Sequence, residues 1–166
     1  MTDSTTDAAV AAIGDACKAV VRAEAVLDAA IDTRHATIRR LWPTLYRFGP
    51  KWLSTEIGED LVTASNLRNI TAELQPRPTR GPFVGPPPTH EESLALGELA
   101  TACRAVVDAR TAHDRALNHR LFTLRARWPE VAHIGPARLE RLIGREFVGE
   151  STIRSAVAEL NRQGRE

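Results

Sequence analysis

Arginine and lysine are concentrated in two stretches of the chain, and their cationic groups are the side chains best suited to bind oxyanions. Residues 33–74 contain six basic and four acidic residues, and residues 119–166 contain nine basic and six acidic residues. The stretches before them have the opposite balance, with two basic and six acidic residues in 1–32 and three and five in 91–118. A guanidinium pairs with two oxygens of a phosphate, so both basic stretches are candidate anion-binding surfaces. The candidate phosphate contacts are Arg39, Arg40, Arg47, Lys51, Arg125, Arg127, Arg138, Arg141 and Arg145.

Motifs typical of catalysis or of metal and cofactor binding are absent from the sequence. There is no GxxxxGK[ST] phosphate loop, no GxSxG nucleophile elbow, no HExxH helix and no CxxC pair. The five histidines are scattered, and no two of them are four residues apart. We therefore expect no metal, no cofactor and no enzymatic activity. An all-α enzyme that uses carboxylates such as Asp28 and Asp114 remains an alternative, although no second catalytic group accompanies them.

Length and composition are those of a small soluble globular protein. The chain has 166 residues, of which 43% are hydrophobic and 26% charged, and its net charge is +1. This balance excludes a histone-like polycation, so any nucleic-acid binding depends on local charge placement. No apolar run approaches the roughly 18 residues of a membrane span, and the N-terminus MTDSTTDAAV lacks the basic region of a secretory signal. We expect a cytoplasmic protein without membrane contact.

An internal duplication organises the chain. ACKAVV at residues 16–21 recurs as ACRAVV at 102–107, and with this offset of 86 residues 24 of 59 positions are identical between 16–74 and 102–160. Cys17 and Cys103 share one position, which favours a core role over a redox pair. The sequence therefore predicts an all-α, pseudo-two-fold symmetric tandem duplication. Its parts are a first repeat over residues 1–74, a linker over 75–90 and a second repeat over 91–166.

The linker is rich in proline, and each repeat begins with a long amphipathic helix. Six of the ten prolines lie between Pro76 and Pro88, which favours an extended spacer, with a PxxP ligand as the alternative. Apolar residues follow a helical spacing, and neither proline nor glycine interrupts residues 15–42 or 98–128. We expect both long helices to end at the Trp-Pro pairs, because the residue before proline disfavours the helical conformation. Such helices need a coiled-coil partner, within the chain or in a second copy.

Two short helices follow each long helix. Gly-Pro suits the start of the first short helix, and Gly58 and Gly144 suit its C-terminal cap. Ser65 and Ser151 occupy the positions of N-caps for the next helix. Each repeat is therefore expected to be a long helix followed by a helix-turn-helix.

The last helix of the second repeat resembles a known recognition helix. Residues 152–164, TIRSAVAELNRQG, are similar to the recognition helix of winged helix-turn-helix regulators of the GntR type, which typically run Thr-Val-Arg-x-Ala-Leu-x-x-Leu-x-x-x-Gly. The preceding LERLIG, residues 139–144, resembles their support helix. The turn at 145–150 is longer than usual, and the chain ends without room for a β-wing. The resemblance implies that eight polar residues face the DNA major groove: Ser65, Asn66, Arg68, Asn69, Ser151, Thr152, Arg154 and Ser155.

The chemistry of these residues fits that implication. Arginine pairs with O6 and N7 of guanine, asparagine with N6 and N7 of adenine, and hydroxyls contact base edges or phosphate. We therefore expect a sequence-specific double-stranded DNA-binding protein with two helix-turn-helix units, acting as a regulator or repressor of transcription. The alternative is a helical protein–protein interaction module, or one that self-associates through its long helices, without DNA binding.

Overall fold

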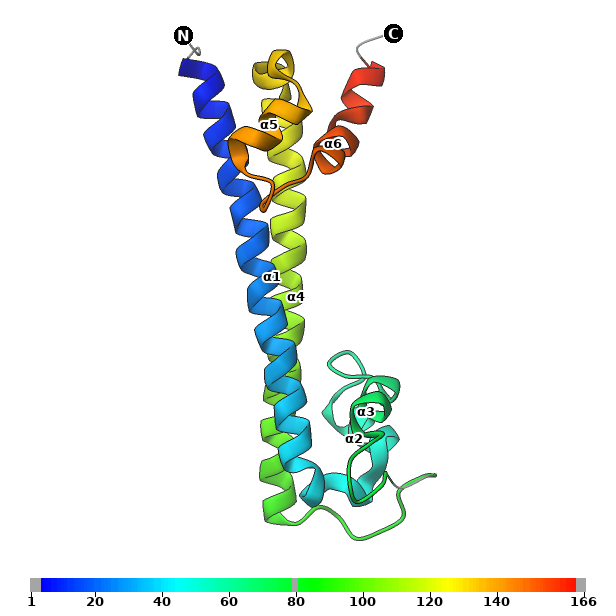
Figure 1. The fold of residues 1–166 in the computed structure, drawn as a ribbon. Coiled ribbons are helices and arrows are strands. Elements are labelled where there is room, and N and C mark those ends of the chain that lie inside the picture. Colours follow the sequence, from blue (N-terminus) through cyan, green and yellow to red (C-terminus); the bar gives the residue numbers. More distant parts are fainter. Residues whose placement is uncertain (1–3, 79–80, 164–166) are drawn as a thin grey trace. The chain divides into compact units, whose positions relative to one another are not determined.

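The computed structural model describes residues 4–78 and 81–163, and the regular structure in these ranges is helical throughout (Figure 1). The all-α fold class is thereby confirmed. In chain order the elements are α1 (Ser4–Leu45), the 3₁₀ helix η1 (Tyr46–Phe48), α2 (Gly49–Ile57), α3 (Ala64–Thr71), α4 (His90–Val131), the 3₁₀ helix η2 (Ala132–Ile134), α5 (Pro136–Ile143) and α6 (Glu150–Gln163).

The elements of the two repeats have matching bounds. Helix α4 begins and ends 86 residues after α1, and η2 lies 86 residues after η1. The ends of α2 and α5, at Ile57 and Ile143, are related by the same offset. The order of elements expected for each repeat is therefore the order observed.

Both long helices extend further than predicted, and the prediction that they end at Trp-Pro is wrong. Each has 42 residues, and Pro43 and Pro129 lie inside its last turn. Trp42 is only 2% exposed, and its Nε1–H donates to the carbonyl oxygen of Pro76 at 2.6 Å. The conformational preference of a residue before proline is modest, so burial of the tryptophan side chain outweighs it and keeps the residue helical.

The chain divides into two compact units, and each unit includes residues of both repeats. Among the described residues, unit 1 combines 4–25 with 111–163, and unit 2 consists of 26–78 and 81–110. Each unit therefore holds one helix-turn-helix, the second part of its own long helix and the first part of the other repeat's long helix. The physical reason is the apolar face on the first part of each long helix, which the short helices of its own repeat do not cover.

The core of unit 1 joins the start of α1 to the second repeat. Its buried residues from α1 are Ala9, Ile13 and Cys17. They pack against nine buried residues of the second repeat, namely Leu124, Trp128, Val131, Leu139, Ile143, Val148, Ile153, Ala156 and Val157. The hydroxyl of Thr6 also donates to the carbonyl oxygen of Glu130 at 3.3 Å, so the two long helices run in opposite directions within this unit.

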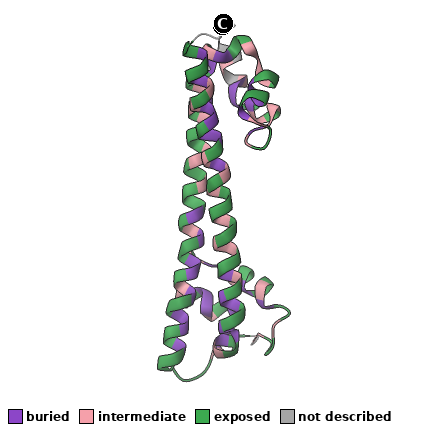
Figure 2. Cartoon of the chain, turned by 60° about the vertical axis from the view of Figure 1, so that its left-hand side comes forward, coloured by how far each residue is buried: buried purple, intermediate pink, exposed green. Residues whose placement is uncertain are grey.

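The core of unit 2 has the reciprocal composition. Ala95, Leu96, Leu99 and Cys103 of α4 pack against Ile38, Leu41, Trp42, Leu45, Phe48, Leu53, Val62 and Leu67 of the first repeat. An ion pair between Arg40 and Glu98 joins the end of α1 to the start of α4. Figure 2 shows the buried residues on the facing sides of the helices and exposed residues on their outer sides.

The proline-rich linker folds back onto unit 2 instead of forming an extended spacer. Phe83 packs against the core and lies 4.8 Å from the Phe48 ring between centroids. The Pro86 carbonyl oxygen accepts a hydrogen bond from Arg47 at 3.2 Å. Residues 79 and 80 lie outside the described residues. The linker is therefore held in place by the Phe83 ring and by backbone carbonyl groups. A proline-rich composition alone does not predict these contacts.

The linker ends in a capping box that starts α4. The backbone N–H of Thr89 donates to Glu92 Oε2 at 2.8 Å, and the N–H of Glu92 donates to Thr89 Oγ1 at 3.2 Å. Arg47 makes a bidentate ion pair with the same carboxylate, at 2.6 and 2.7 Å. The Arg47 hydrogen bond, together with those from Thr89, lowers the pKa of Glu92 to about 2. A charged group therefore fixes where α4 begins.

None of the helices in the described part of the chain combines the length and apolarity needed to cross a membrane.

Candidate nucleic-acid interface

Helix α3 presents one apolar and one polar face. Leu67 is fully buried in the core of unit 2, and the hydroxyl of buried Thr71 donates to the Leu67 carbonyl oxygen at 2.7 Å. The opposite face exposes the four residues predicted to read bases, Ser65, Asn66, Arg68 and Asn69. The Arg68 guanidinium has no hydrogen-bond or ion-pair partner among the described residues. The polar face of α3 is thus free to make contacts.

The predicted N-caps Ser65 and Ser151 are wrong, because both helices begin earlier. Thr63 caps α3, and its Oγ1 accepts from the N–H of Asn66 at 3.2 Å. Helix α6 begins at Glu150, and the Gly149 carbonyl oxygen accepts from the N–H of Ile153 at 3.2 Å. Both serines therefore lie in the first helical turn, with their hydroxyls on the polar face.

Helix α6 repeats this arrangement in unit 1. Ile153 and Val157 are buried, Ser151, Arg154 and Ser155 are exposed, and Thr152 is half-buried. Arg154 forms an ion pair with Glu150, one turn earlier on the same helix. Gly164, the last residue of the resemblance to GntR-type regulators, lies outside the described residues.

The turn between α5 and α6 is held by Glu140. One of its carboxylate oxygens accepts from the backbone N–H of Glu150 at 2.9 Å, and the other pairs with Arg145 Nε at 2.7 Å. Gly144, with a φ of 108°, ends α5 in a conformation that side chains rarely adopt. These contacts orient α6 on α5.

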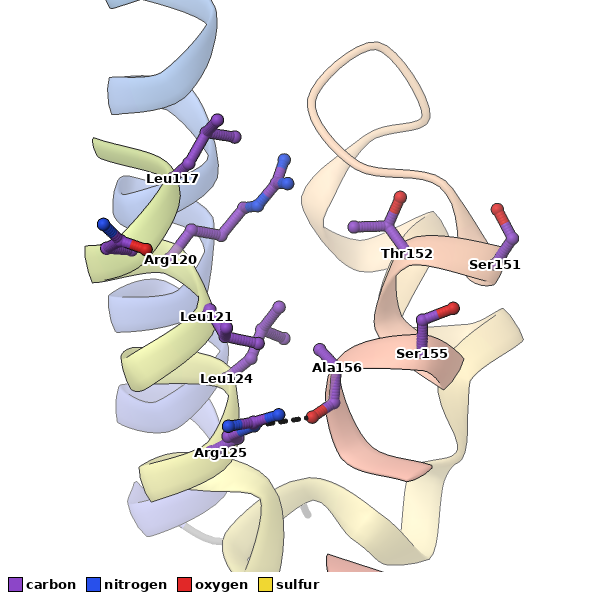
Figure 3. Close-up of a pocket in the computed structure, with 10 residues that line it drawn as sticks. Leu117, Arg120, Leu121, Leu124, Arg125, Ser151, Thr152, Ser155 and Ala156 are labelled. Carbon is purple, nitrogen blue, oxygen red and sulfur yellow. Dashed lines mark hydrogen bonds between the residues drawn. The ribbon is translucent and has the colours of Figure 1, made fainter. Parts of the chain in front are cut away.

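In each unit, a groove lies between the third helix and a long helix of the same repeat. The α4–α6 groove of unit 1 has a volume of about 540 Å³ and is lined by Leu117, Asn118, Arg120, Leu121, Leu124, Arg125, Ser151, Thr152, Ser155 and Ala156 (Figure 3). The α1–α3 groove of unit 2 is lined by His35, Arg39, Asn69, Ile70, Ala72, Glu73 and Leu74.

The two grooves pair the same sequence positions. Arg39 and Asn69 line one groove, and Arg125 and Ser155, 86 residues later in each case, line the other. Arg125 Nε also donates to the Ala156 carbonyl oxygen at 3.0 Å. A predicted phosphate contact and a predicted base-reading residue thus come together in each unit.

Seven of the nine candidate phosphate contacts are exposed, and they are distributed over both units. Arg39, Arg40 and Lys51 are exposed in unit 2. In unit 1 the exposed candidates are Arg127, Arg138, Arg141 and Arg145. Three of these seven side chains form ion pairs, since Arg40 pairs with Glu98, Arg127 with Glu130 and Arg145 with Glu140.

Arg47 has a structural environment instead. Its guanidinium is bidentate on Glu92 and lies 4.1 Å from the centre of the Phe48 ring. Phe48 in turn stacks on Trp52, with 4.3 Å between ring centroids. These contacts engage the guanidinium within unit 2.

Two arginines of the long helices were missed as functional candidates. Arg120 lines the α4–α6 groove, and Arg34, at the equivalent position of α1, is 8% exposed. The Arg34 Nε is buried without a hydrogen-bond partner among the described atoms, and desolvation lowers the pKa of its guanidinium. The sequence did mark these two residues, because an arginine interrupts the apolar face of the long helix at the same position of both repeats.

The two cysteines of the chain are buried in the cores. Burial raises the pKa of Cys17, and it raises that of Cys103 to about 11. Both thiols are free and lie in separate units. Within residues 4–78 and 81–163, no three histidine, cysteine or carboxylate side chains are grouped as metal ligands.

Comparisons of the chain with protein-family models, with curated protein sequences and with solved structures yield no match.

Proposed function

We propose that the chain is a sequence-specific double-stranded DNA-binding protein with two helix-turn-helix units, and that it regulates or represses transcription without catalysing a reaction. The observation that carries this proposal is the recurrence of one arrangement in both units. The third helix exposes an arginine, Arg68 or Arg154, beside further hydrogen-bonding side chains, and an arginine of the long helix lies at the adjoining groove.

The proposed division of labour follows from side-chain chemistry. Arg68 and Arg154 read guanine through O6 and N7, and Asn66 and Asn69 read adenine. The exposed arginines among the candidate phosphate contacts, together with Lys51, contact phosphates. They set the orientation of each unit on the duplex without reading sequence. Thr152 and Ser155 replace the two asparagines in unit 1, so the two half-sites are related but unequal.

We also propose that a tandem duplication produced this arrangement and that the two repeats are related by a pseudo-two-fold axis. The 24 identities in 59 aligned positions support a common origin. The matching element bounds and the reciprocal composition of the two cores add to this support. A covalent pair of reading helices would give the chain the specificity of a dimer.

The test begins with selection of bound duplexes from a random-sequence library, followed by fluorescence anisotropy on the enriched site. We expect affinity to fall steeply with salt, because phosphate contacts release counterions. Arg68→Ala and Arg154→Ala should each cost about 1 to 3 kcal/mol and relax preference at one base position. Arg104→Ala, which removes an exposed arginine of α4 outside both third helices, should leave sequence preference unchanged.

Lack of any enriched sequence, or equal behaviour of all three variants, would contradict the proposal. Self-association in sedimentation experiments, combined with no retention of duplex at low salt, would favour the interaction module instead.

A further inference from the structure

The α4–α6 groove of unit 1 has an amphipathic lining. Leu117, Leu121 and Leu124 line its α4 side, and Ser151, Thr152 and Ser155 line its α6 side (Figure 3). Its volume of about 540 Å³ lies within the range of small-molecule sites. An apolar wall facing hydrogen-bonding groups suits a ligand with an apolar body and one polar end.

The positive charge of the groove indicates that the polar end of such a ligand is anionic. Arg120 reaches from α4 toward Thr152 (Figure 3) and makes no hydrogen bond or ion pair with any described residue. Arg125 adds a second positive charge, although its Nε is engaged with the Ala156 carbonyl oxygen. The ten lining residues that are described include these two arginines and no carboxylate. An anionic group thus finds an available guanidinium on the α4 side of a groove whose α6 side is lined by hydroxyl-bearing residues.

Differences between the repeats confine this site to unit 1. Ala156 is replaced by Ile70 at the equivalent position of α3, and the larger side chain lines the α1–α3 groove. Asn118 is replaced by Asp32, which adds a negative charge to that part of α1. The counterpart of Arg120 in the first repeat is also an arginine, Arg34, but its side chain is buried and does not line the groove.

From these features we infer that the α4–α6 groove binds a small organic anion with an apolar body, such as an aromatic carboxylate. The carboxylate pairs with Arg120 and accepts hydrogen bonds from the α6 hydroxyls, while the ring lies on Leu117 and Leu121. This inference concerns unit 1 alone and does not depend on DNA binding.

The experiment titrates 2-naphthoate into the full chain and follows backbone amide shifts by NMR. We expect saturable shifts at Leu117, Leu121, Thr152 and Ser155, with none of comparable size at the α1–α3 groove. The uncharged analogue 2-naphthylmethanol should bind about tenfold more weakly, because it lacks the charge-assisted pairing with Arg120.

Three variants separate the ligand site from general effects of charge. Arg120→Gln should weaken naphthoate binding about tenfold. Arg115→Gln removes the same charge from an exposed position of α4 that does not line the groove, and it should leave binding unchanged. Ala156→Ile introduces the residue of the other repeat and should abolish binding by filling the groove. Circular dichroism verifies that each variant is folded.

Absence of localised shifts at millimolar naphthoate would overturn the inference, as would equal binding of the alcohol. Since both outcomes are measured on the unaltered chain, the inference stays testable even if a variant fails to fold.

Discussion

One carboxylate, Glu92, connects the start of α4, the linker and the 3₁₀ helix η1 in unit 2. It accepts from the Thr89 N–H and from Arg47, and Arg47 in turn donates to the Pro86 carbonyl oxygen. Its function requires the ionised form, because a protonated carboxyl loses the bidentate pairing with the guanidinium. The linker is therefore held in place by a charge that acid removes.

Glu92 should consequently give the protein a specific acid sensitivity. The carboxyl takes up a proton near its ordinary pKa of 4.5 when unfolded, but near 2 when folded. Between these values the unfolded state binds more protons, so stability falls as the pH falls from about 4.5 to about 2. Glu92→Gln should remove this part of the slope in urea unfolding followed across that pH range. Glu91→Gln, at an exposed neighbouring position, is the control and should retain it.

The two cysteines should be protected from thiol reagents by the fold. Burial raises the pKa of Cys103 to about 11, which lowers its thiolate fraction at about pH 8 by roughly two orders of magnitude. Modification by dithiobis(nitrobenzoate) should therefore be slow in buffer and fast in urea for both thiols. Fast modification of the folded chain would show that these core positions open readily.

Among the helices, α3 depends on a single side chain for its start. Thr63→Ala removes the Oγ1 that accepts from Asn66 N–H and should lower the free energy of unfolding by about 1 kcal/mol. Thr55→Ala, at an exposed position of α2, should change it by less than about 0.5 kcal/mol. Equal effects of the two substitutions in urea unfolding would exclude the capping role of Thr63.

The existence and order of the helices could be predicted from the sequence, whereas several of their ends could not. Periodic apolar residues such as Ile13, Cys17 and Val20 require only a helical spacing to form one face. The end of α1 depends on a competition between the local preference at Trp42-Pro43 and burial of the indole, and burial is a tertiary effect. Helix α3 is capped by Thr63, two residues before the predicted cap Ser65, and residue type alone does not separate the two positions because threonine and serine are both good caps.

The candidate site, too, could be predicted from the sequence only in part. Exposure of Arg68 and Arg154 follows from their position opposite the apolar residues of each helix, so pattern alone places them. The environment of Arg47 does not follow from pattern, because Glu92 is 45 residues away and the linker must first fold back. Arg120 was missed since an isolated cation on an apolar face resembles a surface residue until its neighbours are known.

For the molecule as a whole, each unit requires side chains from both repeats. Ile13→Ala and Leu99→Ala remove buried side chains at equivalent positions of α1 and α4, and each should cost about 2 to 5 kcal/mol. Amide hydrogen exchange should then accelerate mainly in α6 for the first variant and in α3 for the second, because these helices share a core with the altered residue. The opposite pattern would mean that each core is built within one repeat.

The division of the chain between the units also sets the order in which they are completed during synthesis. All residues of unit 2 lie within 26–110, whereas unit 1 needs the first 25 residues together with residues from 111 onward. A ribosome that adds about 5 to 20 residues per second therefore releases unit 2 while Ala9, Ile13 and Cys17 still lack their partners. We therefore expect this apolar face of α1 to stay uncovered on the nascent chain until the residues of the second repeat that pack against it have been synthesised.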